Sequence, residues 1–250
     1  MSSLLMRYCR SLGRYEAGLR EALGAYASIV EPSMGFPREK ELESSAASSR
    51  AAECHSACIA AQSLASAIEG ASVCVVTPGP SLPSVIAKSC EVAVATDSSL
   101  ELLSLLRIRP AALVGDADAS LRLLHMAIQL DVPYLLHSHG DNVYRVAGLL
   151  RSLRPDRLII TSQVDTPCCA LPVGAFTDGD RAAAIAMAFR ARRVVMGAIE
   201  GEPWCGHKDH CEASAKRPKL ELAQRVIIRV AERTGYTVSR VGGVLVMERP

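Results

Sequence analysis

The chain has 250 residues, 49% of them hydrophobic, with 28 basic and 26 acidic side chains and a formal net charge of +2. This length suits one large domain with an extension, and the balanced charge without a Lys/Arg tract excludes a basic nucleic-acid-binding face. No apolar run approaches the roughly 18 residues of a membrane span. Because Arg7, Arg10 and Arg14 interrupt the N-terminus, it is not a signal peptide. We therefore expect a cytoplasmic protein without a membrane or nucleic-acid partner.

Residues 1–70 are predicted to form a helical N-terminal extension. The stretch "EPSMGFPRE" marks a loop, and the Ala- and Ser-rich segment 41–68 has helical spacing. We find little recognisable chemistry in this extension. The remaining residues, 71–250, are predicted to form an α/β catalytic domain.

Nine cysteines are scattered along the chain without a CxxC pair. In a reducing cytosol they would be thiols, whereas hyperthermophiles keep intracellular disulfides. Cys54 and Cys58 lie one helical turn apart, and Cys168 and Cys169 are adjacent. The sequence leaves their redox state open.

From Ala71 onward, short β-branched runs alternate with amphipathic stretches. The predicted strands are "SVCVV", "EVAVA", "AALVG", "YLLH", "RLIIT" and "RRVVMG". Strands that are apolar on both faces and separated by helices indicate a mostly parallel, Rossmann-like sheet covered by helices on both faces. The final runs "YTVSR" and "GVLVMER", joined at "VGG", predict a C-terminal β-hairpin.

Acidic residues follow several of these strands. They are Asp97, Asp116, Asp118, Asp141, Asp178 and Asp180. An isolated DxD pair is usually a helix cap with a turn residue. Six acids at the carboxyl edge of one sheet would repel each other unless cations neutralised them, and Mg²⁺ typically joins carboxylates to substrate phosphates. The pattern therefore predicts a Mg-nucleotide site.

The loop "TPGPS" follows the first strand and offers Gly79, Pro80 and Ser81. Ser81 can cap a helix whose free N–H groups face an anion. The structural alternative is a plain strand-to-helix turn. The loop has neither the P-loop nor the GxGxxG spacing, which excludes those two nucleotide-binding types.

The stretch "HSHGDN" places polar residues between a buried strand and a helix. His137 and His139 can bind metal, donate to phosphate or close the turn. With no cysteine nearby in sequence, phosphate contact is favoured over zinc. Gly140 and Asn142 are assigned to the same nucleotide site.

A competing metal hypothesis concerns "WCGHKDHC", with Cys205, His207, His210 and Cys211. Its spacing matches no common zinc module, so we expect no zinc there. Lys219 opens a long helix, where it is either solvated or a substrate contact. We assign it to substrate binding together with Gln163, which follows the fifth strand.

In this order, "GPSL", "GDADAS", "HSHGDN" and "FTDGDRA" resemble the archaeal 6-hydroxymethyl-7,8-dihydropterin pyrophosphokinase family. "PAALVGDADAS" also looks like an element of thiamine pyrophosphokinases, a related fold. The likeness covers residues 73 to 225. It implies pyrophosphoryl transfer from ATP to a pterin hydroxymethyl group, with Mg²⁺ and release of AMP, in pterin cofactor biosynthesis.

The resemblance and the residues together give each predicted site residue a role. The catalytic set is His137, His139, Asp141 and Arg181; the metal set is Asp116, Asp118, Asp178 and Asp180. The nucleotide set is Gly79, Pro80, Ser81, Asp97, Gly140, Asn142, Thr177 and Gly179. The substrate set is Gln163 and Lys219.

Two segments depart from the family pattern. "GDADA" replaces "TDLDG" but keeps both acids, whereas "ATDSS" keeps Asp97 of an "ADG" element and loses its glycine. The acceptor therefore stays open between a pterin and thiamine, and a non-catalytic nucleotide- or pterin-binding protein is a further alternative. The oligomeric state stays open as well, with a homo-oligomer among the options.

Overall fold

The structure is a computed structural model that describes residues 1–34, 37–50, 53–140, 142–197 and 213–250. These residues form a nine-stranded sheet with the order β6-β5-β4-β3-β2-β1-β7-β9-β8. The strands are β1 Ser72–Val76, β2 Val92–Thr96, β3 Ala112–Gly115, β4 Tyr134–His137, β5 Leu158–Ser162, β6 Leu171–Pro172, β7 Arg193–Gly197, β8 Thr237–Val241 and β9 Val244–Glu248.

Strands β1 to β7 pair in parallel, and β8 and β9 form an antiparallel hairpin beside β7. This confirms a mostly parallel α/β sheet and is compatible with the predicted Rossmann-like layout and C-terminal hairpin. Strand β6 was not predicted, because two residues carry no periodicity. The chain crosses back from β6 to β7 beside β1, so strand order reverses there, as at the ligand-binding edge of open α/β sheets.

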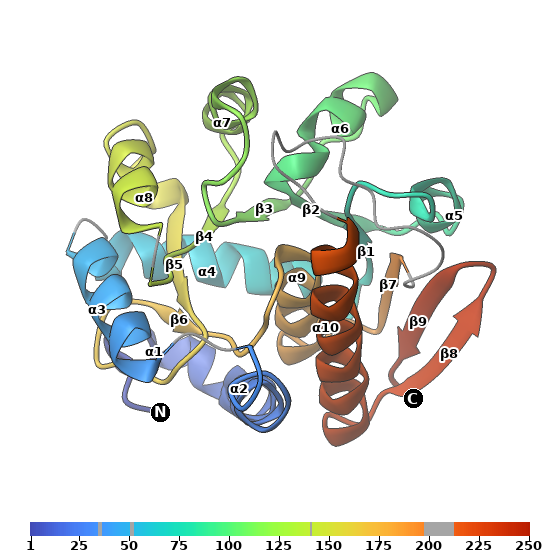
Figure 1. Cartoon of the computed structure of the whole chain (residues 1–250), viewed down its shortest axis with the longest axis horizontal. Helices are drawn as coiled ribbons and strands as arrows, with labels where there is room; N and C mark the ends of the chain where they lie inside the picture. Colours follow the sequence, from blue (N-terminus) through green and yellow to red (C-terminus); the bar gives the residue numbers. More distant parts are fainter. Residues whose placement is uncertain (35–36, 51–52, 141, 198–212) are drawn as a thin grey trace.

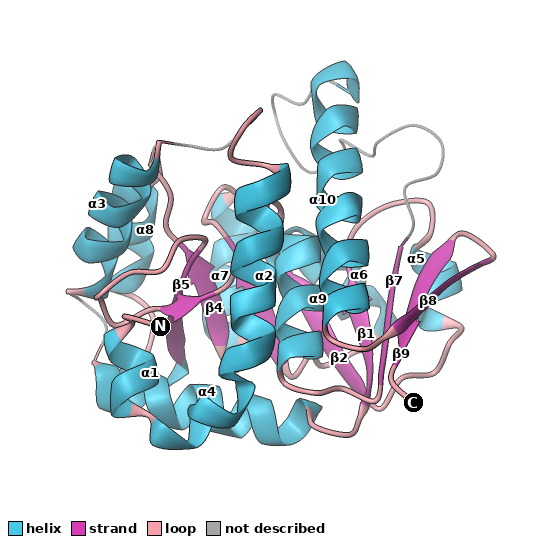
Figure 2. Cartoon of the chain, turned by 90° about the horizontal axis from the view of Figure 1, so that it is seen from below, coloured by secondary structure: helices cyan, strands magenta, loops and turns pink. Residues whose placement is uncertain are grey.

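Helices cover both faces of the sheet (Figure 1). One face carries α5 Leu82–Ile86, α6 Leu100–Leu106, α7 Leu121–Gln129 and α8 Val143–Leu150. The other carries α2 Glu16–Ile29, α4 Cys54–Ile68, α9 Asp178–Ala188 and α10 Ala213–Arg233, and Figure 2 shows α2, α9 and α10 lying in front of the strands. The remaining helices are α1 Leu4–Tyr8, α3 Arg38–Ser49 and the 3₁₀ turns η1 Arg10–Tyr15, η2 Asp97–Ser99 and η3 Pro155–Arg157.

Alternate strand residues enter two separate cores. Leu135 and Ile159 pack with α2, α4 and α9, whereas Leu136 and Ile160 pack with α6, α7 and α8. Because successive side chains of a strand point to opposite faces, a sheet covered on both sides needs apolar residues at every position. This explains the uninterrupted apolar runs in the sequence.

The N-terminal helices share a core with the sheet. Leu19 and Tyr26 of α2 are buried in the same cluster as Val73 of β1. A Cβ on Gly18 would lie 2.7 Å from the Ala188 Cα of α9, so only glycine permits this approach of α2. The described part of residues 1–70 is mostly helical, which is compatible with the prediction, and its packing makes it part of the body of the molecule.

Three disulfides are present among the described residues: Cys9–Cys58, Cys54–Cys169 and Cys74–Cys90. Two of them hold α4, once to the chain between α1 and η1 and once to the segment before β6. Cys168 is a free thiol. The disulfides settle the redox question that the sequence left open for these cysteines.

Among the described helices, none is both long enough and apolar enough to cross a membrane.

Candidate functional site

Four of the predicted acids gather at the carboxyl edge of the sheet. Asp97 follows β2, Asp116 and Asp118 follow β3, and Asp178 is the first residue of α9. Their charges act on one another: Asp116 and Asp118 each raise the pKa values of Asp97 and Asp178. The strand ends thus bring together acids that lie up to 81 positions apart in the chain (178 minus 97).

A tight turn sets the Asp116–Asp118 pair. The backbone N–H of Asp118 donates to Asp116 Oδ1 at 3.2 Å, and Ala117 between them has φ +61°. A left-handed alanine is strained, and such strain concentrates at functional sites. Asp116 and Asp118 are partly exposed, so both carboxylates remain accessible to a ligand.

Asp97 lies beneath this pair. It is fully buried, and its Oδ2 accepts a 2.8 Å hydrogen bond from the Tyr134 hydroxyl. A Cβ on Gly115 would collide with both partners, so the last residue of β3 has to be glycine. Neither Tyr134 nor Gly115 stood out in the sequence, because a strand tyrosine and glycine are ordinary core residues.

Burial raises the pKa of Asp97 to about 7, and the charges of Asp116 and Asp118 add to the rise. Burial and the same neighbours hold the pKa of Asp178 well above its ordinary value, opposed by the Arg181 guanidinium. A cation placed among such carboxylates stabilises their ionised form.

Asp180 has a different role from the other acids. Its carboxylate accepts hydrogen bonds from the backbone N–H groups of Phe176 and Thr177, which closes a capping box at the start of α9. We therefore leave Asp180 out of the proposed metal site. Thr177 is the N-cap residue, and its nucleotide contact stays a prediction.

Arg181 places a buried positive charge beside the acids. Its side chain is 2% exposed, and Nη1 donates to Asp178 Oδ1 at 3.1 Å. Among the described residues, Arg181 Nε has no hydrogen-bond partner, and this nitrogen is itself buried. The guanidinium is thus held beside Asp178.

The histidines lie at the end of β4. His137 is buried, and its Nδ1 is 3.2 Å from the carbonyl oxygen of Thr161, so that Nδ1 carries the proton and Nε2 is the acceptor. Burial holds the pKa of His137 well below its ordinary value, which keeps the ring neutral. His139 Nε2 lies 3.5 Å from Asp116 Oδ2. The structure therefore joins the histidine loop to the acid turn.

Asn142 fixes this junction. Its Nδ2 donates to the carbonyl oxygens of Asp116 at 2.7 Å and His137 at 3.0 Å, and its Oδ1 accepts from the His139 N–H at 2.9 Å. The side-chain amide is used in positioning the two loops. Its nucleotide contact stays a prediction.

The loop after β1 approaches the start of α9. A Cβ on Gly179 would lie 3.1 Å from Thr77 Cγ2, and a Cβ on Gly197 would meet Ser81 Oγ. Gly79 has φ +152°, and Ser81 precedes the five-residue helix α5. The structure therefore brings the "TPGPS" loop beside Asp178, while its anion binding stays a prediction.

The sequence analysis missed a wall of the site made by α3. Ser44 Oγ donates to the His139 carbonyl oxygen at 2.5 Å, Ser48 Oγ donates to Ser138 Oγ at 2.7 Å, and Ser45 Oγ donates to Ser162 Oγ at 3.0 Å. Glu41, on the same face, is fully buried. The buried polar positions 41, 44, 45 and 48 follow the i, i+3, i+4, i+7 spacing that normally carries apolar residues. This periodicity was the available signal.

Binding of Mg²⁺ by these acids stays a prediction. The described residues contain no group of three or more His, Cys, Asp or Glu side chains able to hold an ion by themselves. Mg²⁺ is usually held by one or two carboxylates together with substrate phosphates and water. Asp116, Asp118 and Asp178 are the acids that are open enough to do so.

Three further predictions also remain without a structural test. Asp141 and the "WCGHKDHC" segment with its zinc hypothesis lie outside the described residues. Lys219 is exposed on α10, and its substrate contact stays a prediction.

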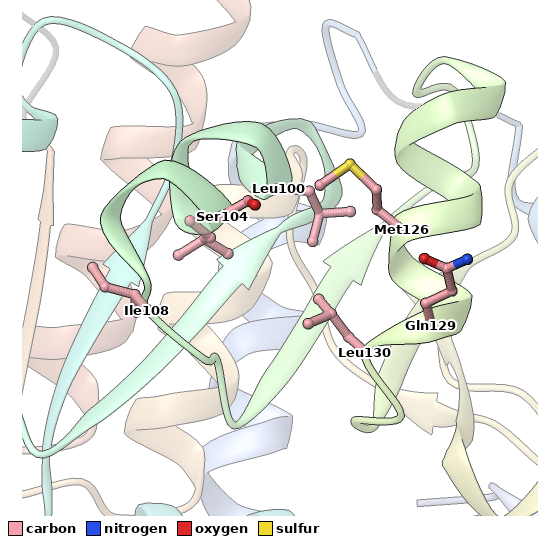
Figure 3. A pocket seen from close by; sticks show the side chains of 7 residues that line it. Leu100, Ser104, Ile108, Met126, Gln129 and Leu130 are labelled. Carbon is pink, nitrogen blue, oxygen red and sulfur yellow. The ribbon is translucent and has the colours of Figure 1, made fainter.

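A separate apolar groove of about 200 Å³ lies between α6 and α7 (Figure 3). Its lining includes Leu100, Leu103, Met126 and Leu130. The acids and the histidines are not part of this lining, so the groove is distinct from the candidate site.

Comparison with known proteins points to one activity. Over 195 residues the chain is 24% identical to a 6-hydroxymethyl-7,8-dihydropterin pyrophosphokinase from Methanocaldococcus jannaschii, covering 70% of the chain and 76% of that protein. Proteins of the same name from Pyrococcus furiosus and Methanothermobacter thermautotrophicus are 28% and 30% identical. Those matches cover 54% and 48% of the chain, and 59% and 54% of the respective relatives.

No protein-family model matches the chain. The similarities support a kinase-type enzyme related to archaeal pterin pyrophosphokinases. None of the three relatives is named as a thiamine pyrophosphokinase, so the predicted relation to those enzymes is unsupported.

Proposed function

We propose that the protein transfers a pyrophosphoryl group from Mg-ATP to the hydroxymethyl group of 6-hydroxymethyl-7,8-dihydropterin and releases AMP. The observation that carries the proposal is the gathering of Asp97, Asp116, Asp118 and Asp178 at one edge of the sheet, where burial and the neighbouring charges raise the pKa values of Asp97 and Asp178. The names of the three archaeal relatives supply the acceptor.

In this reaction the acceptor hydroxyl oxygen forms a bond to the β-phosphorus of ATP. The bond from the β-phosphorus to the oxygen bridging to the α-phosphate breaks, and AMP leaves with that oxygen. Catalysis of phosphoryl transfer rests on positioning and on neutralising phosphate charge. Mg²⁺ among the acids would supply the main part of that neutralisation.

The described side chains have distinct tasks in this proposal. Asp116, Asp118 and Asp178 are the acids that would hold the ion, one or two of them together with the ATP phosphates, and Tyr134 fixes the Asp97 carboxylate beneath them. Arg181 would add a buried positive charge beside the phosphates, next to Asp178. His139, which is partly exposed beside Asp116, is the residue proposed to take the proton of the acceptor hydroxyl, whereas His137 stays buried and neutral.

The decisive experiment incubates the purified protein with Mg-ATP and either 6-hydroxymethyl-7,8-dihydropterin or thiamine, and separates the nucleotide products. We expect AMP and the diphosphorylated pterin in equal amounts. Formation of ADP would exclude pyrophosphoryl transfer, and AMP formation with thiamine alone would identify the other acceptor. Binding without turnover would identify a non-catalytic protein.

A further inference from the structure

Helix α3 is held against the body of the molecule without a share in its apolar cores. None of the described residues of this helix belongs to the apolar clusters that join the other α-helices to the sheet. Its single large apolar side chain, Leu42, is partly exposed. The buried residues of α3 are Glu41, Ser44, Ser45 and Ser48, whereas those of α2 are Leu19, Ala22, Ala25 and Tyr26. Hydrogen bonds therefore replace apolar packing at α3.

Both surfaces of this contact are polar. The serines of α3 donate to the His139 carbonyl oxygen and to the hydroxyl groups of Ser138 and Ser162. The Ser138 hydroxyl in turn donates to the Ser44 carbonyl oxygen at 3.2 Å. A hydrogen bond made on docking replaces one to water, so its net contribution to docking is small. Either surface can therefore meet water when α3 moves away.

Glu41 adds a cost to the docked position of α3. Burial raises the pKa of its carboxyl group, against the lowering charge of His139 and the hydrogen bonds of Gln163 and Gly140. A carboxylate is solvated better by water than by a buried site, even one with partners. Movement of α3 into solvent returns Glu41 to water and recovers that solvation.

α3 occupies a place where open α/β sheets bind ligands. It lies against the carboxyl ends of β4 and β5 and beside α8 (Figure 1). Ligands of such sheets bind outside the carboxyl ends of the strands. Ser138 and Ser162 at those ends are fully buried, whereas Asp116 and Asp118 after β3 are partly exposed. The helix thus covers the β4–β5 end of the candidate site, while the acid turn stays accessible.

We propose that α3 is a lid, which leaves the ends of β4 and β5 to admit the acceptor and closes again once the acceptor is bound. The opening of α3 is inferred from its contacts alone, whereas its part in turnover rests on the proposed function. Mg-ATP reaches the acid turn with the lid in either position. Closure keeps water away from the reacting β-phosphorus, as lids do in other transferases.

Hydrogen exchange of the full-length wild type tests the opening directly. We expect the backbone amides of α3 to exchange about tenfold faster than those of α2, because opening of α3 breaks no apolar core contact. α2 is the matched helix, with 14 residues against 12 in α3. A fixed wall predicts equal protection of the two helices. That result overturns the inference whether or not the protein forms AMP.

A disulfide between α3 and the loop after β4 tests the role in turnover. Ser48→Cys with Ser138→Cys places two thiols where two hydroxyl oxygens lie 2.7 Å apart, and oxidised glutathione joins them. We expect the oxidised double variant to release AMP about tenfold more slowly than its reduced form, because the lid is locked shut. Each single variant and the wild type, treated in parallel, should change no more than one another on oxidation.

Mass spectrometry confirms that the crosslink has formed before turnover is compared. If the crosslinked protein releases AMP as fast as its reduced form, α3 is a fixed wall and the inference is wrong. If the wild type forms no AMP with the pterin while α3 exchanges faster than α2, the proposed function fails and the lid stands.

Discussion

At the scale of single residues, variants of Asp116 and Asp118 can distinguish a structural role of their turn from a metal-binding role. Asparagine caps helices and forms turns about as well as aspartate, but it is a poorer Mg²⁺ ligand. We expect Asp116→Asn and Asp118→Asn to lower turnover by orders of magnitude. The melting temperature without ligand should hold or rise, because crowding among the acids is relieved.

The same two variants should lose the stabilisation that Mg-ATP gives the wild type, since a ligand stabilises only the state that binds it. Asp156→Asn is the matched control, because Asp156 is partly exposed and pairs with Arg154 away from the site. Differential scanning fluorimetry with and without Mg-ATP measures the effect. If both site variants show wild-type turnover and wild-type stabilisation by Mg-ATP, the metal-site hypothesis is wrong.

The raised pKa of Asp97 predicts how the stability of the fold depends on pH. Its pKa of about 7 in the folded protein lies above the value near 4 of an unfolded chain, so folding favours the protonated form. Its contribution to stability is complete below about pH 4 and is lost as the pH rises toward 7. Asp178 shifts in the same direction.

Measured in EDTA, the melting temperature should therefore fall between pH 5 and pH 8, and Mg²⁺ should recover part of the loss at pH 8. Asp97→Asn removes one titrating group and should reduce the fall. A wild-type melting temperature that rises over this range in EDTA would contradict the electrostatic description of the acid cluster.

At the scale of elements, the two disulfides of α4 hold the N-terminal helices against the sheet. Cys54–Cys169 closes a loop of 115 residues, for which chain entropy gives a stabilisation of about 5 kcal/mol. Replacing both cysteines by serine should lower the melting temperature by roughly 10 °C. Cys168→Ser, which removes only the neighbouring free thiol, should leave it near the wild-type value.

Melting under non-reducing conditions compares these proteins directly. Adding reductant should lower the melting temperature of the double variant less than that of the wild type, because one reducible bond is already gone. If the double variant and Cys168→Ser melt at the same temperature, Cys54–Cys169 contributes nothing to the fold.

At the scale of the whole molecule, alternation of apolar runs with amphipathic segments predicted the sheet and its covering helices well. The runs around Val73, Val94 and Ile159 are apolar on both faces, which leaves little choice of architecture. Strand β6 escaped prediction because Leu171–Pro172 is too short for periodicity. The pairing of cysteines escaped it because pairing depends on distances across the fold.

Part of the candidate site could be read from the sequence, since acids at strand ends meet at one edge of a parallel sheet. Glu41, Tyr134 and the serines of α3 could not be found in this way. Their roles depend on how a helix from the first fifth of the chain lies against β4 and β5. Asp180 looked like its neighbour Asp178 in sequence, and only the backbone geometry of α9 distinguishes them.

The contacts that seat α3 also bear on the order of folding. Ser44, Ser48 and Ser45 bond to residues 95, 90 and 117 positions further along the chain. Contacts of such high sequence separation close large loops and form slowly. A newly made chain therefore stays without a docked α3 until these long loops close. During that interval the contact face of α3 exposes serine hydroxyls and one carboxylate instead of apolar side chains. This polar face disfavours aggregation of the unfinished protein.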